Sequence, residues 1–136
     1  MPIRGIHHIN FLVRDLEEAV RRYSELFGLE NFIIEPLASR GVLTARVALG
    51  NQWLVLVQPV DSDGLPARHL AKHGEGFFLM SLAVDDLSSA VARVKLAGGE
   101  MTSDTPRAGL LEWQIQDVAA DHVFGAFVQL CQDENY

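Results

Sequence analysis

Two adjacent histidines, His7 and His8, stand at the start of an apolar run that leads into Asp15 and a helical pattern. An imidazole has an ordinary pKa of about 6.5, so it exchanges protons near neutral pH, and its neutral form binds transition metals. His8 is therefore the first candidate for a catalytic acid or base, with a hydrogen-bonded structural role as the alternative. His7 is expected on the opposite side of the strand or at its entry, and we assign it no function.

A carboxylate and a guanidinium are the next candidates for chemistry. Glu112 lies in LLEWQIQDV, a strand-like run, and its carboxylate is a second candidate for moving a proton. Arg46, in the strand-like run GVLTARVALG, is a candidate for binding an anionic group. Pairing with Glu112 and simple solvation are the alternatives for Arg46. We expect Glu35 to have a surface role.

The remaining histidines and the cysteine give weaker signals. His69 and His73 are four residues apart and would share a helix face, but no third ligand follows them as in a helical metalloprotease motif. Cys131 is expected to be a buried small apolar residue and not a nucleophile. As the single cysteine it cannot form an internal disulfide, which predicts a cytoplasmic protein.

Net charge and hydropathy exclude two classes of partner. The formal charge is −7, which argues against nucleic acid and against an anionic membrane surface as partners. No apolar stretch approaches the roughly 20 residues that a membrane-spanning helix needs. The net charge does not forbid an anionic small molecule as ligand, because a local basic patch can override it.

An internal repeat organises the chain. The segment from 8 to 28, HINFLVRDLEEAVRRYSELFG, matches the segment from 79 to 99, LMSLAVDDLSSAVARVKLAGG, at a constant offset of 71 residues. The identical pairs are Val13 and Val84, Asp15 and Asp86, Leu16 and Leu87, Ala19 and Ala90, Val20 and Val91, Arg22 and Arg93, and Gly28 and Gly99. We therefore expect two copies of one structural unit.

Each copy combines an alternating strand pattern with a helical one. The strand pattern ends at an aspartate that can cap a helix, Asp15 or Asp86, and the helix ends at glycine. Three strand-like runs follow in each half: NFIIEPL, GVLTARVALG and QWLVLVQPV, then EMTS, LLEWQIQDV and FGAFVQLCQ. The sequence thus predicts an α+β fold of two strand–helix–strand–strand–strand modules. A turn-rich connector from 61 to 76, with a short helix near 67–72, separates them.

Strand alternation predicts which side chains face a ligand. If His8 faces inward, Asn10 does too, and the same rule places Leu79 inward in the second copy. Trp113 and Ile115 are expected to pack under the helices, which leaves Glu112, Gln114 and Gln116 inward. The predicted substrate-binding residues are Asn10, Arg46, Trp53, Val55, Leu79, Gln114, Phe127 and Gln129. This mixed polar and apolar set suits an amphiphilic molecule with an anionic or carbonyl group.

The opening IHHINFLVRDLEEAVRRYSELFGL resembles that of the vicinal oxygen chelate superfamily, which includes glyoxalase I, extradiol dioxygenases, methylmalonyl-CoA epimerase and bleomycin-resistance proteins. The middle run GVLTARVALGNQWLVLVQPVDSDGLPARHLAKHGEG is most similar to the epimerase branch. The resemblance implies two βαβββ modules that curl as one mixed sheet around a cleft, with the helices outside. It implies a single domain over 1–136, with modules at about 1–60 and 77–132 joined by the linker.

The same resemblance gives four strand positions for the family's metal. These are His8, Val55, Leu79 and Gln129, the last standing where the family has Glu. Catalytic metal sites need about three protein ligands, and this set offers one imidazole and one neutral amide. We therefore expect neither a metal nor another cofactor.

Three functions stay open at this point. The first is a metal-independent protein that binds or transforms a small carboxylate, thioester or carbonyl compound, as an isomerase or lyase using His8 and Glu112. The second is a metal-dependent epimerase or lyase of the methylmalonyl-CoA epimerase or glyoxalase type. The third is a non-catalytic drug-binding protein of the resistance type. The resemblance also implies a homodimer, because modules of this superfamily commonly pair.

Overall fold

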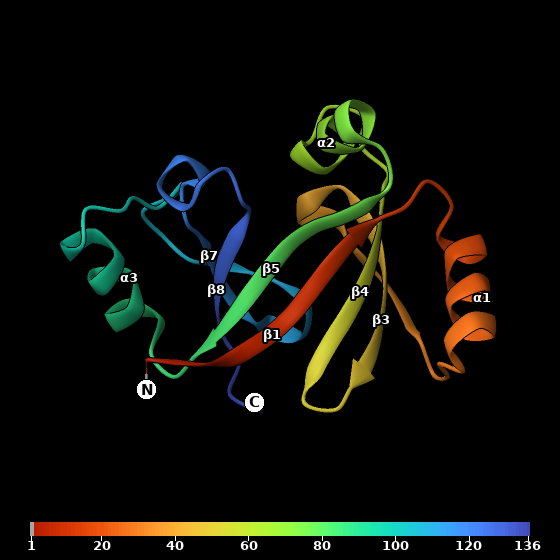
Figure 1. Cartoon of the computed structure of the whole chain (residues 1–136), viewed down its shortest axis with the longest axis horizontal. Coiled ribbons are helices and arrows are strands. Elements are labelled where there is room, and N and C mark those ends of the chain that lie inside the picture. The colour runs from red at the N-terminus through yellow and green to blue at the C-terminus, as the bar shows by residue number, and fades with distance from the viewer. Residues whose placement is uncertain (1) are drawn as a thin grey trace. The chain divides into compact units, whose positions relative to one another are not determined.

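The computed structural model describes residues 2–136, and its element order repeats itself. Both halves follow the order β-α-β-β-β, so the predicted α+β class and the two predicted modules are confirmed. The elements are β1 (Ile3–Leu12), α1 (Leu16–Phe27), β2 (Ile33–Leu37), η1 (Ala38–Arg40), β3 (Val42–Leu49), β4 (Gln52–Pro59), α2 (Leu65–His73), β5 (Gly76–Val84), α3 (Leu87–Leu96), β6 (Arg107–Ala108), η2 (Leu110–Glu112), β7 (Gln114–Asp117), η3 (Ala120–Val123) and β8 (Val128–Gln132) (Figure 1).

The chain divides into two compact units, called here the Arg46 unit and the His8 unit. The Arg46 unit is residues 9–78, and the His8 unit is residues 2–8 together with 79–136. The division falls inside β1 and inside β5, so the beginning of β1 belongs with the second module. The predicted limits of a single domain remain a prediction.

In the Arg46 unit the strand order is β2-β3-β4-β1, and α1 packs on one face. The hydrophobic core joins Leu16 of α1 to Ala45 of β3 and Leu56 of β4, which are register partners. Arg46 and its partner Val55 alternate with this pair, so they point to the opposite face. Arg46 therefore lies on the sheet face away from α1.

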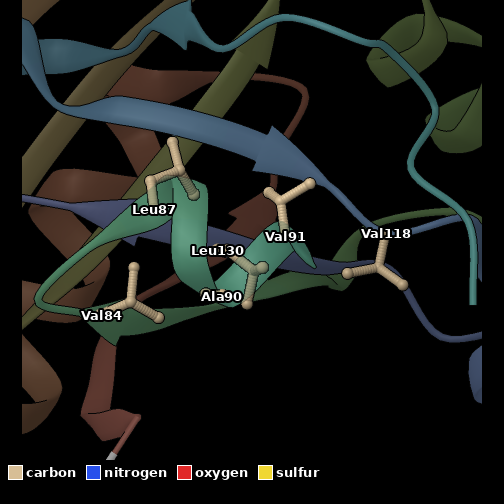
Figure 2. Packing of buried hydrophobic residues seen from close by; sticks show 6 residues of the cluster. All are labelled: Val84, Leu87, Ala90, Val91, Val118 and Leu130. Carbon is tan, nitrogen blue, oxygen red and sulfur yellow. The ribbon is translucent and has the colours of Figure 1, made fainter. Parts of the chain in front are cut away.

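In the His8 unit the strand order is β1-β5-β8-β7-β6, with β5 and β8 parallel and β7 antiparallel to β8. Helix α3 packs on one face of this sheet. Figure 2 shows the buried cluster that forms there, contributed by the helix, by the two neighbouring strands and by the residue after β7: Val84, Leu87, Ala90, Val91, Val118 and Leu130.

Both long helices begin in the same way. The carboxylate of Asp15 accepts the backbone N–H of Glu18 at 3.1 Å, and that of Asp86 accepts the N–H of Ser89 at 3.2 Å. These bonds satisfy N–H groups that have no partner within the first helical turn. The two aspartates predicted as N-caps are confirmed.

A glutamine from the last strand of each module supplies a second cap. Gln58 Oε1 accepts the N–H of Leu16 at 2.7 Å, and Gln132 Oε1 accepts the N–H of Leu87 at 2.7 Å. Each helix is therefore fastened at its first residue to its own sheet. The repeat seen in the sequence is thus a repeat of hydrogen bonds as well.

The second module departs from the predicted strands. The run EMTS forms an isolated bridge, Met101 to Val118, and the two-residue β6 comes later in the chain. The run LLEWQIQDV begins as η2, where Leu111 and Glu112 have φ values of 50° and 63°. The predicted connector helix is present as α2. Within residues 2–136, no helix has both the length and the apolar character required to cross a bilayer.

Candidate functional site

The adjacent histidines lie together inside the His8 unit. His7 is 0% and His8 is 3% exposed, and their Nδ1 atoms are 2.8 Å apart. The indole of Trp113 packs against both rings, edge-on to His7 with centroids 4.4 Å apart and stacked on His8 at 5.0 Å. The pair thus forms a buried aromatic cluster, and His7 is part of it, contrary to the expectation that it lies apart.

The second nitrogen of His7 is held by a carboxylate from the end of the chain. His7 Nε2 lies 2.8 Å from Asp133 Oδ2, and both side chains are largely buried. Because an ionised carboxylate only accepts, Nε2 carries the proton and Nδ1 offers its lone pair toward His8. The ring orientation and the tautomer of His7 are therefore fixed by Asp133.

Cys131 lies beside this pair. It is 0% exposed on β8, and its sulfur and one nitrogen from each histidine all lie within 4.8 Å of one another. Burial, with a further contribution from the charge of Asp133, raises the pKa of the Cys131 thiol to about 12. The thiol is therefore protonated at neutral pH. The expectation that Cys131 is buried is confirmed.

His8 is a poor proton acceptor in this environment. Burial, reinforced by the neighbouring His7, lowers the pKa of His8 to about 3, while the side chain of Gln129 acts in the opposite direction. The ring is neutral throughout the physiological range. A general base works best with a pKa near the working pH, so this environment favours a neutral hydrogen-bonding or metal-binding imidazole.

Two buried polar side-chain atoms on the sheet face that carries the histidine pair have no well-oriented hydrogen bond among the described residues. Ser81 of β5 and Gln129 of β8 are register partners, and both are buried. Ser81 Oγ and Gln129 Oε1 lack a well-oriented hydrogen bond to any residue in 2–136. Leu79 lies two residues before Ser81 and is buried as well, and Phe127 is half-buried two residues before Gln129.

The predicted inward face of β7 is wrong. Ile115 is the register partner of Cys131, whereas Gln116 pairs with Leu130 on the helix face and donates to the Ser103 carbonyl at 2.8 Å. Gln114 pairs with the capping Gln132 on that same helix face. Hydropathy alternation fails here because both faces of β7 are buried, so polar residues on the helix side are satisfied by local acceptors.

Glu112 is likewise not a strand residue. It sits in η2 with a left-handed backbone and an exposed side chain. Two consecutive left-handed residues other than glycine, Leu111 and Glu112, make this loop backbone strained. Glu112 therefore lies on a loop and not in the sheet, and its role in proton transfer stays a prediction.

Arg46 is the buried charge of the Arg46 unit. It is 4% exposed, and its Nη1 donates to Glu35 Oε1 at 2.8 Å. Its guanidinium carbon lies 5.6 Å from the centre of the Trp53 ring, within the range of a cation–π contact. Arg46 Nε has no hydrogen-bond partner within residues 2–136. The expected alternatives, pairing with Glu112 or solvation, are replaced by the pair with Glu35.

The other residues predicted in this unit differ in their burial and in their relation to Arg46. Val55 is its register partner on β4 and is buried, and Trp53 is half-buried nearer the start of that strand. Asn10 of β1 is half-buried, and its Oδ1 lacks a hydrogen bond within the described residues. A buried arginine with an unused donor on an apolar strand surface suits an anionic group carried by an apolar molecule.

The four positions implied for the family's metal do not fit one. Val55 and Leu79 have no donor atom, and Gln129 offers a neutral amide oxygen beside a single imidazole, His8. The expectation that these positions hold no metal stays a prediction. His7 and Cys131 belong to neither the predicted catalytic set nor the predicted binding set. The sequence does show two adjacent histidines and a cysteine two residues after Gln129. It does not show that these residues, which are far apart in the chain, are close together in space.

Comparison with known proteins gives a consistent result. A model of the glyoxalase/bleomycin resistance protein/dioxygenase superfamily matches residues 7–116. The 4-hydroxyphenylpyruvate dioxygenase of Caenorhabditis briggsae is 32% identical over 102 residues, which are 71% of this chain and 25% of that protein. The mitochondrial methylmalonyl-CoA epimerase of Mus musculus is 30% identical over 105 residues, which are 76% of this chain and 59% of that protein.

Solved structures extend the likeness to nearly the whole chain. Methylmalonyl-CoA epimerase from Mycobacterium tuberculosis has a TM-score of 0.92 at 23% identity, over 96% of this chain and 89% of that one. A variant of the Streptomyces coelicolor enzyme in complex with 2-nitronate-propionyl-CoA has a TM-score of 0.92 at 25% identity, over 97% and 99%. By contrast, this chain matches well under two thirds of the length of the two curated relatives.

Proposed function

The chain belongs to the glyoxalase/bleomycin resistance protein/dioxygenase superfamily, and from that premise we propose that it binds a small acyl thioester or a related carboxylate and enolises it. The reaction would be that of an isomerase or lyase working by acid–base chemistry. The observation that carries this proposal is the match, over 97% of the chain, to an epimerase that holds an acyl-CoA analogue.

Arg46 is the anion-binding residue of this proposal. Its side chain is desolvated, and one of its N–H donors is unused while another is paired with Glu35. Hydrogen bonds from a buried guanidinium to a carboxylate or a polarised carbonyl oxygen are among the strong ones in proteins, at about 1.5–3 kcal/mol each. A ligand oxygen at Nε would satisfy the donor that the protein leaves open.

Proton transfer is assigned to Glu112, and His8 is given a different role from the one its type first suggests. The low pKa of His8 makes it a weak base. Its single ring proton lies on Nδ1 and is donated to the Nδ1 lone pair of His7, so His8 stays neutral and offers only its Nε2 lone pair as an acceptor. Glu112 is exposed, so its carboxylate is accessible to a carbon acid. The role of Glu112 is tested by substitution.

Two other functions keep support from specific observations. The comparisons fit a metal-dependent epimerase equally well, since epimerases are among the relatives. A non-catalytic binding protein is favoured by the apolar Val55 and Leu79 at two of the family's ligand positions, and by the half-buried rings of Trp53 and Phe127. A homodimer and a cytoplasmic location remain proposals, and light scattering of the purified chain checks the first.

The deciding experiment measures ligand stabilisation and proton exchange on the same samples. Purified protein is screened by thermal shift against acyl-CoAs, including methylmalonyl-CoA, and against aromatic drugs. Any stabilising thioester is then incubated with the protein in D₂O, and deuterium uptake at the carbon next to the carbonyl is followed by mass spectrometry. Enzyme-dependent uptake is expected, and stabilisation without uptake would instead support the binding protein.

Variants assign the roles. Arg46→Gln should weaken thioester binding by about 10- to 100-fold, as expected for loss of a charge-assisted hydrogen bond, whereas the exposed Arg22→Gln should leave it unchanged. Glu112→Gln should abolish exchange while the thermal shift is kept, and the exposed Glu17→Gln is its control. Exchange that survives Glu112→Gln at the wild-type rate would remove Glu112 from the proposal.

A further inference from the structure

Three metal-ligating atoms converge inside the His8 unit at a place that the family's ligand positions do not describe. His7 and His8 come from β1 and Cys131 from β8, and their donor atoms all lie within 4.8 Å of one another. All three residues are buried. Of the four positions that the family resemblance gave, this set shares only His8.

The spacing of the donors suits a tetrahedral ion. Zinc–nitrogen bonds of about 2.0–2.1 Å and zinc–sulfur bonds of about 2.3 Å place neighbouring ligand atoms roughly 3.3–3.6 Å apart in a tetrahedron. The His7 and His8 Nδ1 atoms are 2.8 Å apart, and no pair in the set exceeds 4.8 Å. Loading the site therefore changes the distances between ligand atoms by about 0.5–1.5 Å and requires no rearrangement of strands.

The surroundings already supply what metal ligands need from their neighbours. Asp133 accepts from His7 Nε2, which leaves Nδ1 as the free lone pair, as in carboxylate–histidine–metal arrangements. Gln129 lies against His8, and its buried Oε1 lacks a well-oriented partner. When an ion takes His8 Nδ1, the ring proton moves to Nε2, and Gln129 Oε1 is placed to accept it.

The cysteine has a comparable neighbour. Ser81 lies against Cys131 from the adjacent strand, and its buried Oγ also lacks a well-oriented hydrogen bond within residues 2–136. A metal-bound thiolate is a better hydrogen-bond acceptor than a thiol, so ionisation of Cys131 would satisfy the Ser81 hydroxyl. A single ion would thus improve the hydrogen bonding of two buried polar atoms, one beside each kind of ligand.

We propose that His7, His8 and Cys131 form a binding site for a thiophilic divalent ion of the zinc class, oriented by Asp133 and completed by an exogenous fourth ligand. Two imidazoles and one thiolate select zinc, cobalt or copper over magnesium and calcium, which prefer oxygen ligands. On binding, the metal–sulfur bond forms as the thiol proton leaves to solvent. The site lies within one unit, and it does not depend on the proposed function.

The test is a cobalt titration of chelator-treated, reduced full-length protein. A cobalt–thiolate bond gives a charge-transfer band in the near ultraviolet, which nitrogen and oxygen ligands do not produce. We expect this band to saturate at a single equivalent of Co²⁺ per chain and to disappear when Zn²⁺ displaces the cobalt. Because this readout uses the wild-type chain, it does not depend on whether any variant folds.

Variants then locate the site. Cys131→Ser should abolish the band, and Asp133→Asn should weaken cobalt binding by about 10- to 100-fold while keeping the band, since it removes an outer-shell partner. The matched control is the double variant His69→Gln and His73→Gln. That pair on α2 has rings 4.5 Å apart and would be the adventitious binder. Its removal should change nothing.

Three outcomes would overturn the site. The first is the absence of a charge-transfer band in the wild-type protein at saturating Co²⁺. The second is a band that survives Cys131→Ser. The third is loss of stoichiometric binding in the His69 and His73 double variant while the Cys131→Ser protein still binds. Deuterium uptake by a thioester is unaffected by any of these readouts, so failure here is distinguishable from failure of the proposed function.

Discussion

Among the described residues, the buried charged side chain of the Arg46 unit is the guanidinium of Arg46, whereas the His8 unit buries two imidazoles and a thiol side by side. Arg46 pairs through Nη1 with Glu35, a residue of the adjacent strand only 11 positions away in the sequence. His7 is satisfied by Asp133, which is 126 positions away. The buried polar group of the Arg46 unit is therefore paired with a residue nearby in the sequence, and that of the His8 unit with a residue far away in the sequence.

The two units share the way in which their helices are fastened. Asp15 and Asp86 cap the helices, and Gln58 and Gln132 accept the first helical N–H in each. What was duplicated is thus the frame that places a helix on a sheet. The side chains on the opposite face differ, and there one unit carries a guanidinium and the other carries two imidazoles and a thiol.

The largest expected effect concerns the two tryptophans. Trp113→Ala should lower the free energy of unfolding by about 3–5 kcal/mol, because the 3% exposed ring packs on both histidines. Trp53→Ala should cost about 1–2 kcal/mol, since that ring is half-buried. Urea denaturation measures both. Equal losses would show that the histidine cluster is no better packed than the Arg46 surface.

An intermediate effect is expected at the glutamine caps. Gln58→Ala and Gln132→Ala should each lower the free energy of unfolding by about 1–2 kcal/mol. Each substitution removes the acceptor of the first N–H of a helix, in a hydrogen bond that is partly buried. Urea denaturation of the two variants side by side gives the comparison. If only one of the two variants lost stability, the two glutamine caps would not be equivalent.

The smallest expected effect is a pH dependence at one cap. The Ser89 N–H and hydroxyl donate to the Asp86 carboxylate and hold its pKa below its ordinary value. The stabilisation is therefore present above the unfolded pKa of about 3.9 and is lost as the pH falls through the lower folded value. Between pH 7 and pH 2, wild type should lose more stability than Asp86→Asn, as followed by thermal melts. Asp104→Asn, an exposed control, should behave as wild type, and parallel curves for Asp86→Asn would contradict the cap's charge dependence.

Much of the frame was predictable from the sequence, because its signals are local. Asp15 and Asp86 precede helical patterns, and β3 alternates cleanly between an α1-facing residue such as Ala45 and an opposite one such as Arg46. The β7 face was not predictable. Both of its faces are buried, so Ile115 and Gln116 are both inside and hydropathy alternation has no solvent side to mark.

By itself the sequence determined the repeat, the capping residues and the α+β class, since these depend on residue types within a turn of helix or a strand. Only the tertiary structure decided that Cys131 meets His7 and His8, that Asp133 orients His7, and that Arg46 pairs with Glu35. The physical reason is strand pairing. Strand pairing brings side chains together according to sheet order and register, and these are set by packing over the whole unit. Neighbouring residues in the sequence therefore do not reveal which distant residues will be in contact.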